Sequence, residues 1–243
     1  MKPRRFKVED LSAQLVRLDG AEAHHALRVL RLKAGADVIL FNGQGQEASG
    51  RIREVSRDSF TVELGVRRQT VPPATATLIL AVATPKGERA DWLVEKCAEI
   101  GTTALWLLET ERGSVHPGEG KLARWRRKAA EAAKQAGNAA MMDIEPPQPV
   151  ADVLAAATPA RIYYGDPHRA KVSLLTALRA DPTASEAPQR TLILIGPEGG
   201  FTDAECQVIE RAGGRAVRLT GAILRVETAA VVAASVWSVC YLD

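Results

Sequence analysis

The spacing of apolar residues along the chain changes near residue 72. Before it, short apolar segments alternate with polar ones, as half-buried strands do. Asn42-Gly43 is a hairpin signal, and helical spacing over 21–33 is followed by Gly35, where a helix would end. The expected strands are 15–18, 37–41, 50–55 and 60–64. This part predicts a small, mostly antiparallel β-barrel, a fold that often, though not always, holds nucleic acid.

A second rhythm begins after Val71-Pro72-Pro73-Ala74, a break that we take as the boundary between domains 1–72 and 73–243. Beyond it, buried strands alternate with helical segments. The expected strands are 78–83, 104–108, 161–164, 191–195 and 216–219, and the expected helices are 90–100, 121–136, 150–157, 171–179, 203–212 and 228–242. This alternation predicts an α/β domain with a mostly parallel sheet covered by helices.

The run from Thr191 to Glu205 is the most informative segment. It reads as a buried strand, a turn Gly196-Pro197-Glu198-Gly199-Gly200, and a capping box that begins at Thr202. Such a turn leaves backbone N–H groups free to hold a ligand, although a tight structural turn would use the same residues. The loops after Tyr164 and Leu219 fall at the same carboxyl edge of the sheet, where ligands bind, and this favours a site.

The last expected helix, 228–242, is apolar on nearly every side. A helix of this kind must be buried all round, so it lies inside the domain, faces a second subunit, or both. It is shorter than the ~20 residues that span a bilayer. No apolar run follows the basic N-terminus, so we expect no secretory signal and a cytoplasmic protein. Cys97, Cys206 and Cys240 are expected to be buried, reduced thiols.

The overall charge is mild, but the basic residues are grouped. Hydrophobic residues make up 46% of the chain and charged residues 25%, with a net charge of +3. Basic clusters occur at the N-terminus, in the segment 24–33 and along the helix 121–136. Segregated charge suits contact with nucleic-acid phosphates, although a solvated basic face explains the same pattern.

Two further segments carry candidate chemistry. Arg225 and Glu227 stand just before the apolar helix, where a charged pair suggests a site; otherwise Glu227 is only a favourable acid in a first helical turn. Lys86 and Arg89 follow the first strand of the second domain. The chain has no lysine of the Walker type, no G-x-G-x-x-G motif and no spaced set of metal ligands. These absences argue against ordinary nucleotide, dinucleotide and metal sites.

In this order and spacing, the segments resemble those of the bacterial 16S rRNA uracil-N3 methyltransferases of the SPOUT class, over nearly the whole length. The turn Ile195–Phe201 and the segment Ile223–Ala229 are the most specific pieces. The other matching residues are Arg28-Val29-Leu30-Arg31, Lys86-Gly87-Glu88, Glu95-Lys96, Glu99-Ile100-Gly101, Arg112 and Ser114.

The resemblance implies a PUA-like RNA-binding barrel at 1–72 and, at 73–243, a SPOUT-like domain with a C-terminal trefoil knot. It implies a homodimer that binds S-adenosylmethionine and methylates N3 of a uridine in 16S rRNA or the assembled small subunit, with no metal. The implied catalytic residues are Glu227, Arg225 and Glu198. The implied cofactor-binding residues are Tyr164, Gly165, Ile195, Gly196, Glu198, Gly199, Gly200, Leu219, Leu224, Thr228 and Ala229. The implied RNA-binding residues are Arg4, Arg28, Arg31, Lys86, Arg112, Arg124, Arg127 and Lys128.

The chain departs from the family pattern at two positions. Asn138 and Ala222 stand where the family usually has arginine. The two missing arginines leave open an RNA-binding protein with a vestigial cofactor pocket. The glycine turn leaves open an α/β enzyme that binds nucleotide phosphates.

Overall fold

A computed structural model describes residues 3–69, 76–158, 160–180 and 189–241. The chain separates into two compact units, Met1–Pro72 with Ala133–Met141, and Pro73–Ala132 with Met142–Asp243. The boundary predicted at residues 71–74 lies outside the described residues. Each unit has its own hydrophobic core.

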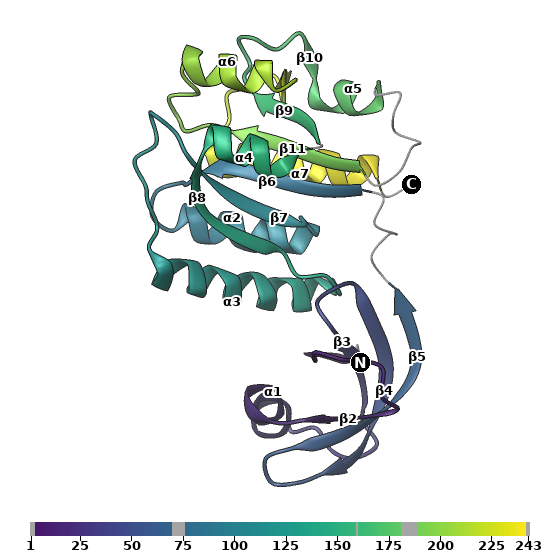
Figure 1. Ribbon diagram of the computed structural model, residues 1–243. Helices are drawn as coiled ribbons and strands as arrows, with labels where there is room; N and C mark the ends of the chain where they lie inside the picture. Colours follow the sequence, from purple (N-terminus) through teal and green to yellow (C-terminus); the bar gives the residue numbers. More distant parts are fainter. Residues whose placement is uncertain (1–2, 70–75, 159, 181–188, 242–243) are drawn as a thin grey trace. The chain divides into compact units, whose positions relative to one another are not determined.

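The first unit contains a five-stranded sheet in the order β1-β3-β4-β5-β2 (Figure 1). Its strands are β1 (Arg4–Lys7), β2 (Leu15–Leu18), β3 (Asp37–Phe41), β4 (Gln46–Val55) and β5 (Phe60–Gln69). β1 pairs with β3 in parallel and the other pairs are antiparallel, as predicted. Among the described residues no ladder joins β1 to β2, so the sheet is an open half-barrel. β1 was not predicted, because Phe6 is its one buried side chain.

The helix predicted at 21–33 is shorter than expected. The segment forms one α-helical turn, α1 (Gly20–His24), and then the π-helix η1 (His25–Val29). Leu30 donates its N–H to the carbonyl of His25, and Arg31 has a φ of 53°. This left-handed backbone at Arg31 ends the helix, so the predicted end at Gly35 is wrong.

The second unit is built on a seven-stranded sheet in the order β10-β12-β9-β11-β6-β7-β8, in which every pair is parallel. Its strands are β6 (Ala76–Ala83), β7 (Ala104–Glu109), β8 (Asp143–Pro149), β9 (Arg161–Gly165), β10 (Val172–Ser173), β11 (Gln189–Ile195) and β12 (Arg215–Arg218). Its helices are α2 (Arg89–Ile100), α3 (Glu119–Ala136), α4 (Val150–Ala157), α5 (Leu174–Arg179), α6 (Asp203–Arg211) and α7 (Val226–Cys240). The predicted α/β architecture is confirmed.

The sequence missed the two edge strands of this sheet. β8 contains three prolines, which is unusual for a strand, but an edge strand tolerates proline because one side of it needs no N–H donors. β10 has only two residues, and its pairing with β12 makes α5 begin at Leu174 rather than at the predicted Lys171.

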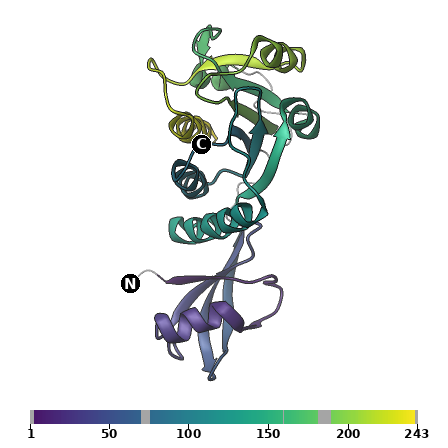
Figure 2. The ribbon, with the colours of Figure 1, turned by 90° about the vertical axis from the view of Figure 1, so that its left-hand side faces the viewer.

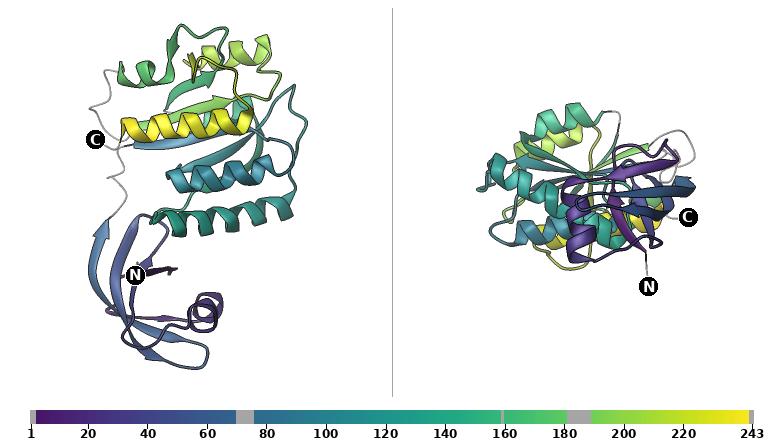
Figure 3. Two further views of the ribbon diagram at one scale, coloured as in Figure 1. Left: turned by 180° about the vertical axis from the view of Figure 1, so that it is seen from behind. Right: turned by 90° about the horizontal axis from the view of Figure 1, so that it is seen from below.

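Helices cover both faces of the sheet (Figures 1 and 2). Residues of α2, α3, α5 and α7 share one apolar cluster, and α4 and α6 contribute to the other. Helix α7 lies between α2 and α5 (Figure 3). Its Ala230, Ala233 and Ala234 are buried, whereas Val239 is 61% exposed. The helix is therefore buried on its inner face but not all round within one chain. Among the described residues, no helix combines the length and the apolar content that crossing a membrane requires.

Candidate active site

A cavity of about 500 Å³ lies in the second unit, at the carboxyl ends of β9, β11 and β12. Three loops line it, 165–169, 196–201 and 219–224, together with Arg112, Asp203, Val217, Val226 and Ala229. The three loops that were expected to meet at this edge of the sheet therefore do meet. A cavity of this volume can enclose a ligand the size of a nucleoside.

The glycine turn forms one wall of the cavity. A Cβ atom on Gly196 would lie 3.1 Å from the ring of Phe201, which is buried and packs edge-on against Tyr164 at 6.3 Å between centroids. Gly200 has a φ of 69° and donates its N–H to the carbonyl of Pro197 at 2.8 Å. Glycine is needed at both positions, for close packing at one and for a left-handed backbone at the other.

The capping box predicted after this turn is confirmed. Thr202 Oγ1 accepts the N–H of Glu205, and Glu205 Oε2 accepts the N–H of Thr202. Glu205 Oε1 also accepts the N–H of Glu111 at 2.9 Å, which ties the loop after β7 to the start of α6. The side chain of Glu205 therefore fixes the end of the turn that leads into α6, because it bonds the backbone of both Thr202 and Glu111.

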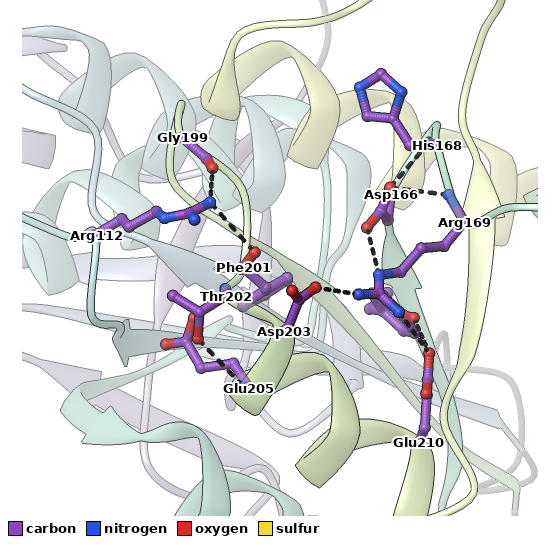
Figure 4. A network of polar contacts seen from close by, with 11 residues as sticks. Arg112, Asp166, His168, Arg169, Gly199, Phe201, Thr202, Asp203, Glu205 and Glu210 are labelled. Carbon is purple, nitrogen blue, oxygen red and sulfur yellow. Dashed lines mark hydrogen bonds and ion pairs between the residues drawn. The ribbon is translucent and has the colours of Figure 1, made fainter.

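Arg112 holds the same turn from the side of the loop after β7. Its Nη1 donates to the carbonyl of Gly199 at 2.5 Å and lies 3.5 Å from that of Phe201 (Figure 4). Arg112 was predicted to contact RNA phosphates. In the structure its guanidinium bonds the backbone of the turn, an interaction that sequence spacing does not show.

Most of the predicted cofactor residues line the cavity: Gly165, Ile195, Gly196, Glu198, Gly199, Gly200, Leu219, Leu224 and Ala229. Tyr164 and Thr228 do not. The side chain of Tyr164 is fully buried in the cluster that α4 and α6 share, and its hydroxyl donates to Glu210 Oε1 at 2.6 Å. Burial and this hydrogen bond raise the pKa of Tyr164, so the hydroxyl keeps its proton at neutral pH.

The three predicted catalytic residues have different surroundings. Glu198 is exposed and lines the cavity. Arg225 is exposed at the N-terminal boundary of α7. Glu227 is 6% exposed and lies between the lining residues Val226 and Ala229. Its Oε1 is 3.8 Å from Arg89 Nε, and its buried Oε2 has no hydrogen-bond partner in the described part of the chain.

The predicted RNA-binding residues of the first unit are all exposed. They are Arg4, Arg28 and Arg31. Arg28 Nη2 lies 4.0 Å from Asp58 Oδ1, a weak pair between two solvated side chains.

Among the predicted RNA-binding residues of the second unit, some have an ion partner and some have none in the described part of the chain. Arg124 donates to both carboxylate oxygens of Asp91, at 2.7 and 2.8 Å, and Lys128 Nζ lies 2.7 Å from Glu95 Oε2. Arg127 and Lys86 are exposed and have no ion partner among the residues that the structure describes. Only the unpaired cations are free to meet a phosphate without losing a bond.

The sequence reasoning missed several lining residues, namely Asp166, Pro167, His168, Arg169 and Asp203. Only the position of these residues in the chain could have indicated them. Residues 166–169 form the loop after Tyr164, which was expected at the site, but no motif distinguished them from a solvated surface loop.

The family model for the RNA methyltransferase domain matches residues 72–238, and the model for the RNA methyltransferase PUA domain matches residues 18–65. This chain belongs to that RNA methyltransferase family. This membership confirms the family resemblance that the sequence motifs indicated. The departure at Ala222 falls within the wall of the cavity.

Relatives and solved structures agree with the family. The ribosomal RNA small subunit methyltransferase E of Synechocystis sp. is 30% identical over 93% of this chain and 73% of its own length. The protein of the same name from Bacillus subtilis is 27% identical over 90% and 87%. The Neisseria gonorrhoeae enzyme of that name, solved with bound S-adenosylmethionine, has a TM-score of 0.80 at 26% identity and 96% coverage of both chains.

Proposed function

We propose that this protein transfers a methyl group from S-adenosylmethionine to N3 of a uridine in the 16S rRNA of the small ribosomal subunit. The supporting observation is a cavity closed by a glycine turn at the carboxyl edge of a parallel sheet, in a chain of the RNA methyltransferase family. The relatives named above are small-subunit rRNA methyltransferases, which favours that RNA as the substrate.

The residues of the cavity fit the cofactor. Gly200 leaves open space where a side chain would project, so backbone can approach a ligand. Leu219, Leu224 and Ala229 offer an apolar surface on which an adenine ring would pack. Asp166 and Glu198 also line the cavity, and carboxylates suit hydroxyl, amino or sulfonium groups. When bound, the cofactor supplies a methyl group that is already activated by its positively charged sulfur.

The protein must then align the uracil nitrogen and remove its proton. N3 of uracil is a poor nucleophile until that proton leaves, so a general base or a cation that stabilises the anion is needed. We assign the general base to Glu227, which lies in sequence between the lining residues Val226 and Ala229. Its buried Oε2 has no hydrogen-bond partner among the residues that the structure describes. Arg89 Nε lies 3.8 Å from the other carboxylate oxygen. In this proposal Arg225, which is exposed just before α7, stabilises the uracil anion. Glu198 is the alternative carboxylate.

We further propose a cytoplasmic homodimer, with 1–72 as an RNA-binding domain and 73–243 as a knotted methyltransferase domain. The outer face of α7, with Val239 exposed, supports a second subunit there. Light scattering checks this assembly, which should have twice the 26.1 kDa of one chain.

Arg127→Gln is expected to weaken binding to a 16S rRNA fragment and to reduce the slope of log K against log salt by about one, because one phosphate contact is lost. Arg124→Gln is the matched comparison, since Asp91 already takes two bonds from that guanidinium. Fluorescence anisotropy over a salt series measures both slopes. Equal slopes for wild type and Arg127→Gln would remove Arg127 from the RNA contacts.

The function is tested by mass spectrometry of 16S rRNA from a strain that lacks the gene. We expect one 3-methyluridine to disappear and to return with a plasmid copy of the wild-type gene. An unchanged set of modified nucleosides would contradict the proposal. Calorimetry with S-adenosylmethionine and with ATP separates a methyltransferase from an enzyme that binds nucleotide phosphates.

A further inference from the structure

Arg169 connects two walls of the cavity through one guanidinium. It follows β9, on the wall formed by 165–169, and its Nη2 bonds Asp203 Oδ1 at the first residue of α6. Its Nη1 lies 3.7 Å from Glu210 Oε1 and its Nε lies 3.6 Å from Asp166 Oδ2. Figure 4 shows the guanidinium between these carboxylates. Arg169, Asp166 and Asp203 all line the cavity.

The loop that carries Arg169 is itself well fixed. Asp166 Oδ1 accepts the N–H groups of His168 and Arg169, at 2.8 and 3.1 Å. Asp166 also donates its N–H to the carbonyl of Val217 on β12 and accepts the N–H of Ala170. These bonds fix the shape of the loop, and the side chain of Arg169 adds contacts between the loop and α6.

The contact between Arg169 and Glu210 leads to the hydrophobic core. Glu210, in the last turn of α6, accepts the hydroxyl of the buried Tyr164 at 2.6 Å. Tyr164 belongs to β9, the strand that precedes the loop. The loop after β9 is thus joined to both ends of α6, to Asp203 at the start and to Glu210 at the end.

We propose that Arg169 is a positioning residue that holds the loop 166–170 onto α6 and so fixes the width of the cofactor cavity. The inference rests on the proposed binding of S-adenosylmethionine in this cavity. Arg169 itself is no phosphate ligand here, because three carboxylates surround its single positive charge.

The exposure of the network separates this role from a purely structural one. The side chains of Arg169, Asp203 and Glu210 are 38%, 87% and 45% exposed. Ion pairs at such exposure contribute little to folding stability. Removing Arg169 should therefore leave the fold intact while it loosens the wall, so cofactor affinity and stability should respond differently.

The test is isothermal titration of the full-length protein with S-adenosylmethionine and with S-adenosylhomocysteine. For Arg169→Gln we expect both dissociation constants to rise roughly tenfold, with kcat at saturating cofactor near that of wild type and KM for the cofactor raised. Arg169→Lys keeps the charge but not the planar fork and should recover part of the affinity. Adding Asp203→Asn to Arg169→Gln should change the affinity little further, because both substitutions break the same contact between Arg169 and Asp203.

Arg211→Gln is the control, since this exposed arginine lies on the same helix and outside the cavity. Its cofactor affinity should match that of wild type. Affinity in Arg169→Gln equal to that of wild type would overturn the positioning role. So would a loss of affinity that accompanies a large drop in melting temperature in both Arg169→Gln and Arg169→Lys. A wild-type protein that does not bind S-adenosylmethionine would instead refute the proposed function.

Discussion

Replacing Glu227 with glutamine is expected to slow methyl transfer by about 10²- to 10⁴-fold, the usual contribution of a general base. Glutamine keeps the shape of the side chain but cannot accept the N3 proton of uracil. Because Glu227 does not itself line the cavity, the affinity for S-adenosylmethionine should stay nearly unchanged. Single-turnover transfer to 16S rRNA and calorimetry of cofactor binding measure the two quantities separately.

The burial of Glu227 makes this the sharpest test of the mechanism. Its side chain is 9% exposed, and Arg89 Nε lies 3.8 Å from its Oε1. A buried carboxylate with one unpartnered oxygen is costly to keep, so a role for that oxygen explains why it is there. Glu198→Gln is the matched comparison, because Glu198 lines the cavity but is exposed. A Glu227→Gln enzyme with wild-type rates would exclude Glu227, and a slow Glu198→Gln enzyme would shift the assignment to Glu198.

The sequence was sufficient to predict which loops meet at the edge of the sheet where the cavity lies. The alternation of strands and helices predicted a parallel sheet, and parallel strands bring the loops after Tyr164, Ile195 and Leu219 together. Glycines in the turn and the capping box at Thr202 carried local signals that do not depend on distant contacts. Predictions of this kind succeed because the physics is local or follows from topology.

The direction of individual side chains could not be predicted in the same way. Strand β9 is buried on both faces, so no alternation of polar residues shows which tyrosine faces which side. Tyr163 packs in the cluster of α2 and α7, and Tyr164 in that of α4 and α6. The family resemblance implied that Tyr164 contacts the cofactor; in the structure its hydroxyl bonds Glu210.

The partners of charged residues were also beyond the reach of sequence. Arg112 bonds the carbonyl of Gly199, 87 positions away in sequence, and Arg124 bonds Asp91 on the neighbouring helix. From sequence alone, an arginine in a basic cluster is interpreted as a phosphate contact, because the sequence does not show its partner. Arg169 carried no motif at all, yet its guanidinium contacts residues at both ends of α6.

Gly196→Ala is expected to weaken the binding of S-adenosylmethionine by about ten- to a hundredfold, equivalent to roughly 1.4–2.8 kcal/mol. The new Cβ atom would lie 3.1 Å from the ring of Phe201 and 3.3 Å from its backbone nitrogen. The ring has little room to move, because it is buried and packs edge-on against the buried Tyr164. The turn itself must therefore shift, and the turn is one wall of the cavity.

A control separates this effect from the general cost of adding a methyl group. Gly118 has open space at the Cβ position and lies outside the cavity, so Gly118→Ala should bind the cofactor as wild type does. Calorimetry of both variants, with melting temperatures measured without ligand, distinguishes a displaced wall from partial unfolding. If Gly196→Ala binds with wild-type affinity, the glycine serves the turn and not the ligand. A loss confined to Gly196→Ala means that the close contact of Gly196 with Phe201 keeps the turn in place for cofactor binding.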